Sequence, residues 1–426
     1  MTTATATPTP QGERFMDRRY GLFLHWNPSS VVGQEISWSR EFDRPEILNK
    51  PRAHEVSPRV CIPAALYDTL YRHFDGRDFD APALVEKAKR WGHRYIYLTT
   101  KHHDGFCMFD TAATDYKSTA PECPAGRDFV RELADACHAG GMGFGVYYSQ
   151  PDWHHPDYRT ENHDRYIDYL HAQVEELCTK YGPIDTWWFD GLAGDSQVTG
   201  RPAPKPFERP ADPARWRAEE LITKMRRWQP DMAINERCAL PCDFDTPEQR
   251  VGEYRPERPW ESTITLGDQW AYSFNERVKH TDDVIGFLID AACGGGNYVV
   301  NVGPDRYGNV PPEQERVLDG VGRWLERYGH TIYGTRAGPW PRWIWGGSTH
   351  REGKVWIHVR RWPERYATLE LHLGGGTLRG EPRLVTPGSL DHRVEDGTLY
   401  LILPVRDHDG IDAIVEVDFD TMPRFD

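Results

Sequence analysis

Short, continuous apolar runs alternate with longer segments of helical spacing along the first three-quarters of the chain. Runs rich in aromatic and β-branched residues are typical of strands buried on both faces. The longer segments have the 3.6-residue periodicity of amphipathic helices. The predicted strands are residues 20–26, 95–100, 144–149, 185–189, 232–235, 260–266 and 298–302. The predicted helices are residues 82–91, 128–139, 165–181, 213–227, 282–293 and 312–328.

This alternation predicts parallel βα units, and seven or eight units over about 320 residues predict an α/β fold of the (β/α)8-like TIM barrel type. After Tyr333 the pattern changes to short alternating runs separated by glycine-rich turns, which indicates a C-terminal antiparallel β-sandwich. We therefore expect a disordered tail over residues 1–13, the barrel over 14–335 and the sandwich over 336–426. The strands predicted for the sandwich are residues 354–360, 367–373, 383–386, 399–403 and 413–419.

Charge and composition exclude several classes of partner. The net charge of −14 argues against nucleic acid binding. No apolar run approaches the roughly 18 residues of a membrane span, so no membrane partner is expected. The first 13 residues lack the apolar stretch of a signal peptide, so a cytoplasmic protein is expected unless a leader was removed. A homo-oligomer is left open.

The cysteines predict reduced thiols rather than a metal site. Eight are scattered through the chain without a CxxC pair. Cys238 and Cys242 are four residues apart, but no second pair completes a zinc site.

One predicted strand ends in a carboxylate followed by a glycine, at Asp190 and Gly191. In a parallel barrel, catalytic groups lie where the strands end, at the loops that lead to the helices. An isolated Asp-Gly pair is more often a helix cap or a turn. The functional interpretation is favoured here because other predicted strands also end in polar groups. These are His25, the pair His102 and His103, Tyr148 and Arg237.

Together these side chains suit a compact, polyhydroxylated ring, with Trp26 and Trp38 nearby to pack on its apolar face. Cleavage of a glycosidic bond requires two carboxyl groups, one as nucleophile or base and one as acid. Asp190 is the candidate at a fixed position. The second must come from a loop, and the residues alone leave Glu35, Glu236, Glu248, Glu253 and Glu261 open.

The chain resembles the retaining α-L-fucosidases of glycoside hydrolase family 29 over about residues 15–330. The motifs that carry the resemblance follow one another in the order found in that family. They are Gly21-Leu22-Phe23-Leu24-His25-Trp26, Lys101-His102-His103-Asp104-Gly105-Phe106, Trp188-Phe189-Asp190-Gly191, Thr246-Pro247-Glu248, Trp260-Glu261 and Asn297-Tyr298-Val299-Val300-Asn301-Val302-Gly303-Pro304.

The resemblance implies an exo-acting glycosidase that releases terminal α-L-fucose from fucosylated glycans or glycosides and needs no cofactor. It implies that Asp190 is the nucleophile. The Thr-Pro-Glu motif assigns the acid/base to Glu248, with Glu253 and Glu236 as the next candidates. The implied substrate-binding residues are His25, Glu35, Trp38, His102, His103, Tyr148, Arg237 and Trp270.

The chain departs from the family pattern at three places around the expected pocket. Asn27 follows His25-Trp26 where the family usually has glycine, and Glu236 precedes Arg237 where aspartate is common. The loop Glu35-Ile36-Ser37-Trp38 replaces the usual Glu-Trp-Tyr. These changes leave the reaction class intact but leave open the linkage and the choice between fucose and L-galactose.

Two alternatives from other classes remain. One is a metal-dependent hydrolase that uses His25, His102, His103 and Asp190 as ligands, which a chelator would inactivate. The other is a sugar-binding protein that has kept the pocket but lost turnover.

Overall fold

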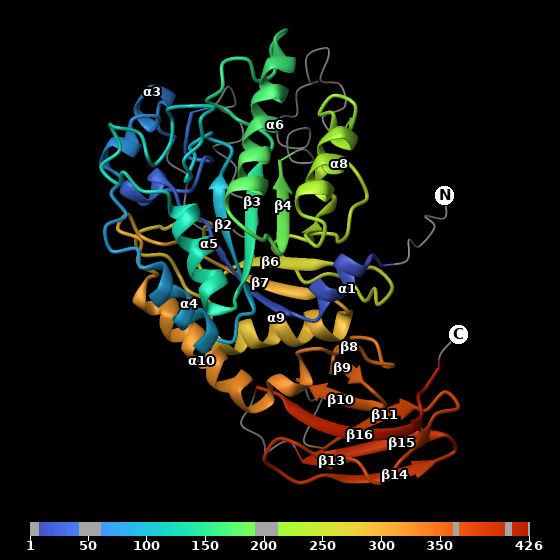
Figure 1. Cartoon of the computed structure of the whole chain (residues 1–426). Helices are drawn as coiled ribbons and strands as arrows, with labels where there is room; N and C mark the ends of the chain where they lie inside the picture. Colours follow the sequence, from blue (N-terminus) through green and yellow to red (C-terminus); the bar gives the residue numbers. More distant parts are fainter. Residues whose placement is uncertain (1–7, 42–60, 192–211, 361–365, 405–410, 425–426) are drawn as a thin grey trace.

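The computed structural model describes residues 8–41, 61–191, 212–360, 366–404 and 411–424. Seven parallel strands form one sheet with the order β5-β4-β3-β2-β1-β7-β6. Helices α4, α5, α6, α8, α9 and α10 surround it (Figure 1). The strands are β1 (Tyr20–Leu24), β2 (Tyr95–Lys101), β3 (Gly143–Ser149), β4 (Thr186–Asp190), β5 (Ala233–Ile234), β6 (Glu261–Thr265) and β7 (Asn297–Val302).

The helices of this part follow the predicted segments closely, and α10 has the predicted bounds. Asp80 and Asp128 cap α4 and α5, because each side chain accepts a hydrogen bond from the third backbone N–H beyond it. The helices are α1 (Pro10–Met16), α3 (Ala64–Tyr67), α4 (Ala81–Arg90), α5 (Phe129–Gly140), α6 (His163–Lys180), α8 (Ala218–Trp228), α9 (Thr281–Gly294) and α10 (Pro312–Tyr328). The 3-10 helices are η1 (Pro28–Val31), η2 (Leu70–His73), η3 (Glu236–Cys238) and η4 (Gly329–Thr331).

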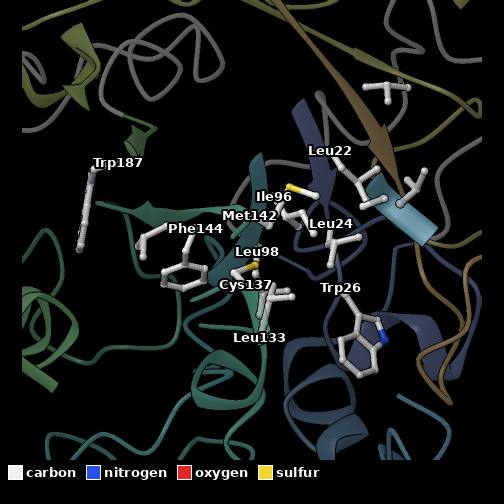
Figure 2. Packing of buried hydrophobic residues seen from close by; sticks show 14 of the residues in the cluster. Leu22, Leu24, Trp26, Ile96, Leu98, Leu133, Cys137, Met142, Phe144 and Trp187 are labelled. Carbon is white, nitrogen blue, oxygen red and sulfur yellow. The ribbon is translucent and has the colours of Figure 1, made fainter. Parts of the chain in front are cut away.

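Alternate side chains of the strands supply two separate apolar layers, because successive residues point to opposite faces of a sheet. One face packs under the helices (Figure 2), where Leu22, Leu98 and Phe144 belong to the same apolar core as Leu133 of α5. Side chains of the other face, most of them aromatic, fill the space that the curved sheet encloses. These interior residues are Phe15, Met16, Phe23, Tyr95, Tyr97, Tyr147, Trp188, Ala233, Phe244 and Val299.

Two strand glycines make room for this aromatic interior. A Cβ on Gly21 would lie 2.3 Å from the ring of Tyr95, and a Cβ on Gly145 would lie 2.5 Å from the ring of Tyr97. Any larger residue at either position would displace a buried tyrosine, so the close approach of strand and ring requires glycine.

The closed eight-stranded barrel is not confirmed, because the edge strands β5 and β6 do not pair with each other among the described residues. The irregular segment 244–248 lies between them. Phe244 forms a parallel bridge with Asn235 after β5, and Glu248 forms one with Thr263 in β6. The expected eighth strand is thus replaced by irregular backbone that hydrogen-bonds to both edges.

The prediction of a disordered tail is wrong for its second half. Residues 1–7 lie outside the described residues, but α1 begins at Pro10, and the side chain of Thr9 accepts a hydrogen bond from Gly12 N–H as its cap. Phe15 packs 4.6 Å from Phe244, measured between ring centroids, so α1 closes the end of the sheet where the strands begin.

The C-terminal part is antiparallel, as predicted, and forms two sheets that share one apolar core (Figure 1). Val355 and Ile357 point into that core, whereas Trp356 between them packs against the first domain. An ion pair of 3.1 Å between Arg360 and Asp290 on α9 also joins the two parts. The strands are β8 (Arg336–Ala337), β9 (Gly346–Arg351), β10 (Lys354–Val359), β11 (Tyr366–His372), β12 (Thr377–Leu378), β13 (Arg383–Leu384), β14 (Asp391–Glu395), β15 (Thr398–Pro404) and β16 (Ala413–Thr421).

In the described part of the chain, none of the helices combines the length and apolar character that a membrane crossing demands.

The interior holds one carboxyl group that should make stability depend on pH. Burial raises the pKa of Glu261 to about 8, although hydrogen bonds from Tyr95 and Tyr97 oppose the rise. The folded state therefore keeps a proton that the unfolded state loses above its ordinary pKa near 4.5. Stability from this group is present at low pH and is lost as the pH rises from about 4.5 to about 8.

We predict that Glu261→Gln weakens this pH dependence, because glutamine cannot ionise. Between pH 5 and pH 9, the wild-type Tm should fall by several degrees more than the Tm of the variant. The matched control is Glu257→Gln, which changes an exposed glutamate. Parallel Tm curves for wild type and Glu261→Gln would contradict the prediction.

Candidate active site

Asp190 is the last residue of β4 and lies where the strands end, as the sequence predicts. Its carboxylate is held from several sides. Tyr147 on β3 donates its hydroxyl to Oδ2 at 2.7 Å, and the backbone N–H of Gly191 donates to Oδ1 at 2.8 Å. Arg237 donates to Oδ1 at 2.6 Å, and Nε2 of His103 lies 3.7 Å from Oδ2.

These neighbours keep Asp190 ionised. Burial alone would raise its pKa, but the charges of Arg237 and His103 and the hydrogen bond from Tyr147 together lower the pKa to about 2. Asp190 is therefore an anion throughout the pH range in which proteins function, as a nucleophile has to be. The position of Gly191 at φ 101° explains why glycine follows Asp190, since this backbone conformation is strained for other residues.

Arg237 joins Asp190 to Glu248. Its Nη1 donates to Asp190 Oδ1 at 2.6 Å and to Glu248 Oε2 at 3.1 Å. A shared partner at these distances limits the separation of the two oxygens to less than about 6 Å, compatible with the roughly 5–5.5 Å between carboxyl groups in retaining glycosidases. Glu248 is the more accessible of the two, with 32% of its side chain exposed against 19% for Asp190.

Arg237 is itself fixed by the segment that fills the gap in the sheet. Nε donates to Thr246 Oγ1 at 2.8 Å, and Nη2 donates to the Thr246 carbonyl at 2.9 Å. Thr246 in turn donates its N–H to Glu236 at 3.0 Å. The Thr-Pro-Glu motif therefore holds the arginine with its threonine and places its glutamate on the same guanidinium.

The other candidates for the second carboxyl group lie elsewhere. Glu236 is occupied by Thr246, and Glu253 is exposed. Glu261 is fully buried and bonds Tyr95 at the opposite end of the sheet's interior. Glu35 is also buried, and its carboxylate accepts backbone N–H groups of Ile36, Trp270 and Ala271. Among the five candidates, only Glu248 has a described contact with the guanidinium that binds Asp190.

His25 belongs to the same cluster and is held in one tautomer. Asn301 donates its amide to the Trp270 carbonyl at 2.7 Å, so its Oδ1 accepts from Nδ1–H of His25 at 2.5 Å. Burial lowers the pKa of His25 to about 3, although the contact with Asn301 opposes the shift. The ring is therefore neutral at ordinary pH, and it lies 4.9 Å from the Trp270 ring, centroid to centroid.

His102 is held by Ser37 and the buried carboxylate of Asp104. Asp104 accepts hydrogen bonds from Ser37, Tyr67, Asn27 and the Phe106 N–H. Because the Ser37 hydroxyl donates to Asp104, its oxygen accepts from Nδ1–H of His102 at 2.6 Å. Two departures from the family pattern, Asn27 and Ser37, thus meet on one carboxylate behind a pocket histidine.

His103 is also held with its proton on Nδ1, by a residue of β3. The Ser149 hydroxyl donates to the Pro151 carbonyl at 2.7 Å, so its oxygen accepts from Nδ1–H of His103 at 2.6 Å. Trp38 and Trp153 pack edge to face with each other at 5.2 Å, and both contact the His103 ring. Trp38 and Trp153 thus place aromatic rings beside His103. The prediction of Trp26 near the pocket is wrong, because its ring packs against Phe74, Phe79 and Phe129 in the layer under the helices.

The prediction of Tyr148 as a pocket residue is wrong. Its hydroxyl donates to Gln173 on α6 at 2.8 Å, and Lys101 lies over its ring, so Tyr148 belongs to the layer between sheet and helices. Its neighbour Tyr147 points inward and bonds Asp190. Consecutive residues of a strand point to opposite faces of the sheet, so only one of two adjacent tyrosines can reach the pocket. Which one does so depends on which alternate residues of the strand face inward.

A metal ion would find three candidate ligand residues here, two histidines and an aspartate, but also an unfavourable charge. One ligand atom each from His102, His103 and Asp190 lie within 4.8 Å of one another. The same carboxylate already bonds Arg237 at 2.6 Å, and a divalent cation would have to sit beside that guanidinium.

We predict that Ser37→Gly lowers kcat/KM on an aryl α-L-fucoside about tenfold, the effect of one hydrogen bond worth roughly 1.4 kcal/mol. Glycine removes the hydroxyl that orients His102 but tolerates the φ of 54° found at this position. The matched control is Ser29→Ala on the same loop, which should keep wild-type kinetics. Equal kcat/KM for Ser37→Gly and wild type would show that this hydroxyl does not position His102.

Comparisons with known proteins identify the family to which the chain belongs. The family model described as α-L-fucosidase matches residues 1–330. A solved structure, α-L-fucosidase isoenzyme 1 from Paenibacillus thiaminolyticus, is 31% identical, with a TM-score of 0.80 and coverage of 96% of this chain and 99% of that one.

Other relatives are more distant. A Bacteroides thetaiotaomicron α-L-fucosidase, trapped as a covalent intermediate with a fluorinated fucosyl fluoride, has a TM-score of 0.81 at 24% identity and covers 99% of this chain and 98% of its own. The tissue α-L-fucosidase of Bos taurus is 24% identical over 383 residues, which are 84% of this chain and 76% of that protein. The aligned region makes up 66% of a Caenorhabditis elegans relative. On the strength of the family match, this chain belongs to the α-L-fucosidase family of glycoside hydrolases.

Proposed function

We propose that this chain is an exo-acting, retaining α-L-fucosidase in which Asp190 is the nucleophile and Glu248 is the acid/base. The observation that carries the proposal is the single nitrogen of Arg237 that bonds both carboxylates. The upper limit of about 6 Å on the separation of these two oxygens supports double displacement over inversion, for which carboxyl groups are usually about 6.5–9.5 Å apart.

In the first step an oxygen of Asp190 attacks the anomeric carbon, and the bond from that carbon to the leaving oxygen breaks. Glu248 gives its proton to the leaving oxygen. In the second step Glu248 takes a proton from water, whose oxygen attacks the anomeric carbon and displaces the Asp190 carboxylate. Two inversions leave the released sugar with its original anomeric configuration.

The remaining site residues bind and orient the sugar in this proposal. His25, His102 and His103 each have Nδ1–H directed at a protein acceptor, which leaves Nε2 as the second polar atom of each ring. In this proposal these Nε2 atoms bond sugar hydroxyls, whereas Trp38 and Trp270 offer flat apolar surface. Glu35, whose carboxylate accepts the Trp270 N–H, remains a predicted substrate-binding residue in this proposal.

The substrate class follows from the relatives and is a proposal for this chain. The Bacteroides enzyme was trapped with a fluorinated fucosyl donor, so its pocket accepts a fucose-configured ring. We extend that class to terminal α-L-fucosides here. Discrimination between fucose and L-galactose is tested by comparing aryl glycosides of the two sugars.

We predict that Asp190→Gly loses nearly all turnover on an aryl α-L-fucoside, because the glycosyl-enzyme cannot form. Azide should restore part of the rate and yield β-L-fucosyl azide, since the small anion enters the vacated position of the carboxylate. Absence of rescue, or an α-configured product, would count against the nucleophile role. Sugar binding without any release of fucose by the wild type would instead support a non-catalytic binding protein.

For Glu248→Ala we expect the opposite stereochemistry. Azide should attack the glycosyl-enzyme that Asp190 still forms and yield α-L-fucosyl azide. Turnover of substrates with poor leaving groups should fall roughly 10²–10⁴-fold, the usual contribution of general acid catalysis. Glu253→Ala is the matched control, because it removes an exposed glutamate of the following loop. Full activity of Glu248→Ala on a poor leaving group would assign the acid to another residue.

Chelation separates this proposal from a metal-dependent hydrolase. We predict that dialysis against EDTA leaves kcat and KM unchanged, because Arg237 already supplies the positive charge beside Asp190. Loss of activity that added zinc restores would favour the metal-dependent alternative.

A further inference from the structure

The thiols of Cys238 and Cys242 lie beside the arginine of the active site and contact each other. Cys238 ends η3, directly after Arg237, and its Sγ lies 3.2 Å from Sγ of Cys242. Ala239, at φ 70°, turns the chain back so that the two side chains meet four residues apart. Such contact is unusual for the cysteines of this chain, since none of the other six has a described contact with a second sulfur.

We propose that Cys238 and Cys242 form a reversible disulfide when the protein meets a small peroxide, and that this bond protects the Arg237 segment from irreversible oxidation. A disulfide has an S–S bond of about 2.05 Å, so the sulfurs need to approach by roughly 1 Å. The ring closed by the bond spans only residues 238–242, so the change is local.

The two thiols differ in pKa and in exposure, as the two steps of disulfide formation require. A hydrogen bond from Cys242 lowers the pKa of Cys238, although burial opposes this, and the same contact raises the pKa of Cys242. The thiolate is the reactive form of cysteine. Cys242 is partly exposed, which gives a small oxidant access to the pair, whereas Cys238 is only 1% exposed.

The chemistry balances with hydrogen peroxide as the oxidant. The thiolate of Cys238 attacks one peroxide oxygen, the O–O bond breaks, and the released hydroxide takes a proton to become water. The sulfur of Cys242 then attacks the sulfenic sulfur of Cys238, and a second water leaves. Two thiols and one peroxide thus give one disulfide and two waters, and an added dithiol reverses the reaction.

The position of the pair explains why protection matters. Without a resolving partner, the sulfenic acid of Cys238 would proceed to a sulfinate, which thiols do not reduce. That buried anion would lie one residue from Arg237 and compete with Asp190 and Glu248 for the guanidinium. The Cys242 carbonyl also accepts a hydrogen bond from Arg258 at 2.8 Å.

The test is peroxide treatment of the full-length wild type and of Cys242→Ser, followed by mass spectrometry of peptides. In the wild type, we expect the peptide with residues 238–242 to lose two hydrogen atoms and to regain them with dithiothreitol. In Cys242→Ser, Cys238 should instead gain two oxygen atoms that dithiothreitol does not remove. The control Cys61→Ser removes an exposed thiol and should behave like wild type.

Turnover of an aryl fucoside gives a second readout that rests on the proposed function. After peroxide and dithiothreitol, Cys242→Ser should recover at least about tenfold less activity than wild type. A wild-type peptide that stays fully reduced, or a Cys242→Ser variant that recovers fully, would overturn the proposal. The peptide masses decide it even if the chain proves to have no fucosidase activity, so the two proposals fail separately.

Discussion

The bond of Arg237 to two carboxylates is the interaction on which the site depends. Asp190 and Glu248 would repel each other at this separation, and one guanidinium between them offsets both charges. Its position is set by Thr246, which lies two residues before Glu248. The backbone that carries the proposed acid/base therefore also holds the cation that lowers the pKa of the proposed nucleophile.

The contact of Arg237 with both carboxylates also places a requirement on the proposed catalytic cycle. In the proposed mechanism, Glu248 gives a proton to the leaving oxygen, so its carboxyl group has to leave its contact with Arg237. A glutamate with about a third of its side chain exposed has space to exchange Arg237 for the leaving oxygen. Asp190, fixed by Tyr147 and the Gly191 N–H as well, keeps its place when that exchange occurs. The difference in burial between the two carboxyl groups thus matches the difference in their roles.

The irregular closure of the sheet serves this arrangement. A regular eighth strand would extend between β5 and β6 and alternate its side chains across the sheet. The segment 244–248 instead makes isolated bridges, from Phe244 to Asn235 on one side and from Asp245 and Glu248 to Trp260 and Thr263 on the other. Thr246 and Glu248 are two residues apart, a spacing that places side chains on one face of an extended chain, and both meet the guanidinium of Arg237. A loss of regular pairing at this point is compatible with a site that needs one side chain to move.

Sequence reasoning located the parts of this fold that local patterns encode. The strand ending in Asp190 was clear because an apolar run stops at a carboxylate and a glycine. The absence of a regular eighth strand could not be predicted, because residues 238–259 show neither alternation nor helical spacing. The prediction of Tyr148 as a pocket residue is wrong for a different reason. The sequence of two adjacent tyrosines does not indicate which one faces inward. That depends on which alternate residues of the strand lie on the same side of the sheet as the Asp190 carboxylate.

The contacts that orient the histidines could not be read from the chain at all, because each joins distant segments. Ser37 and Asp104 are 67 residues apart, and His25 and Asn301 are 276 apart. Their common effect is that three imidazoles keep the proton on Nδ1, since each partner is an oxygen already committed as an acceptor. His25 also resists protonation, with a pKa of about 3. A neutral His25 ring fixed in this tautomer accepts a hydrogen bond at Nε2, so the contact proposed between His25 and a sugar hydroxyl does not change with pH above about 3.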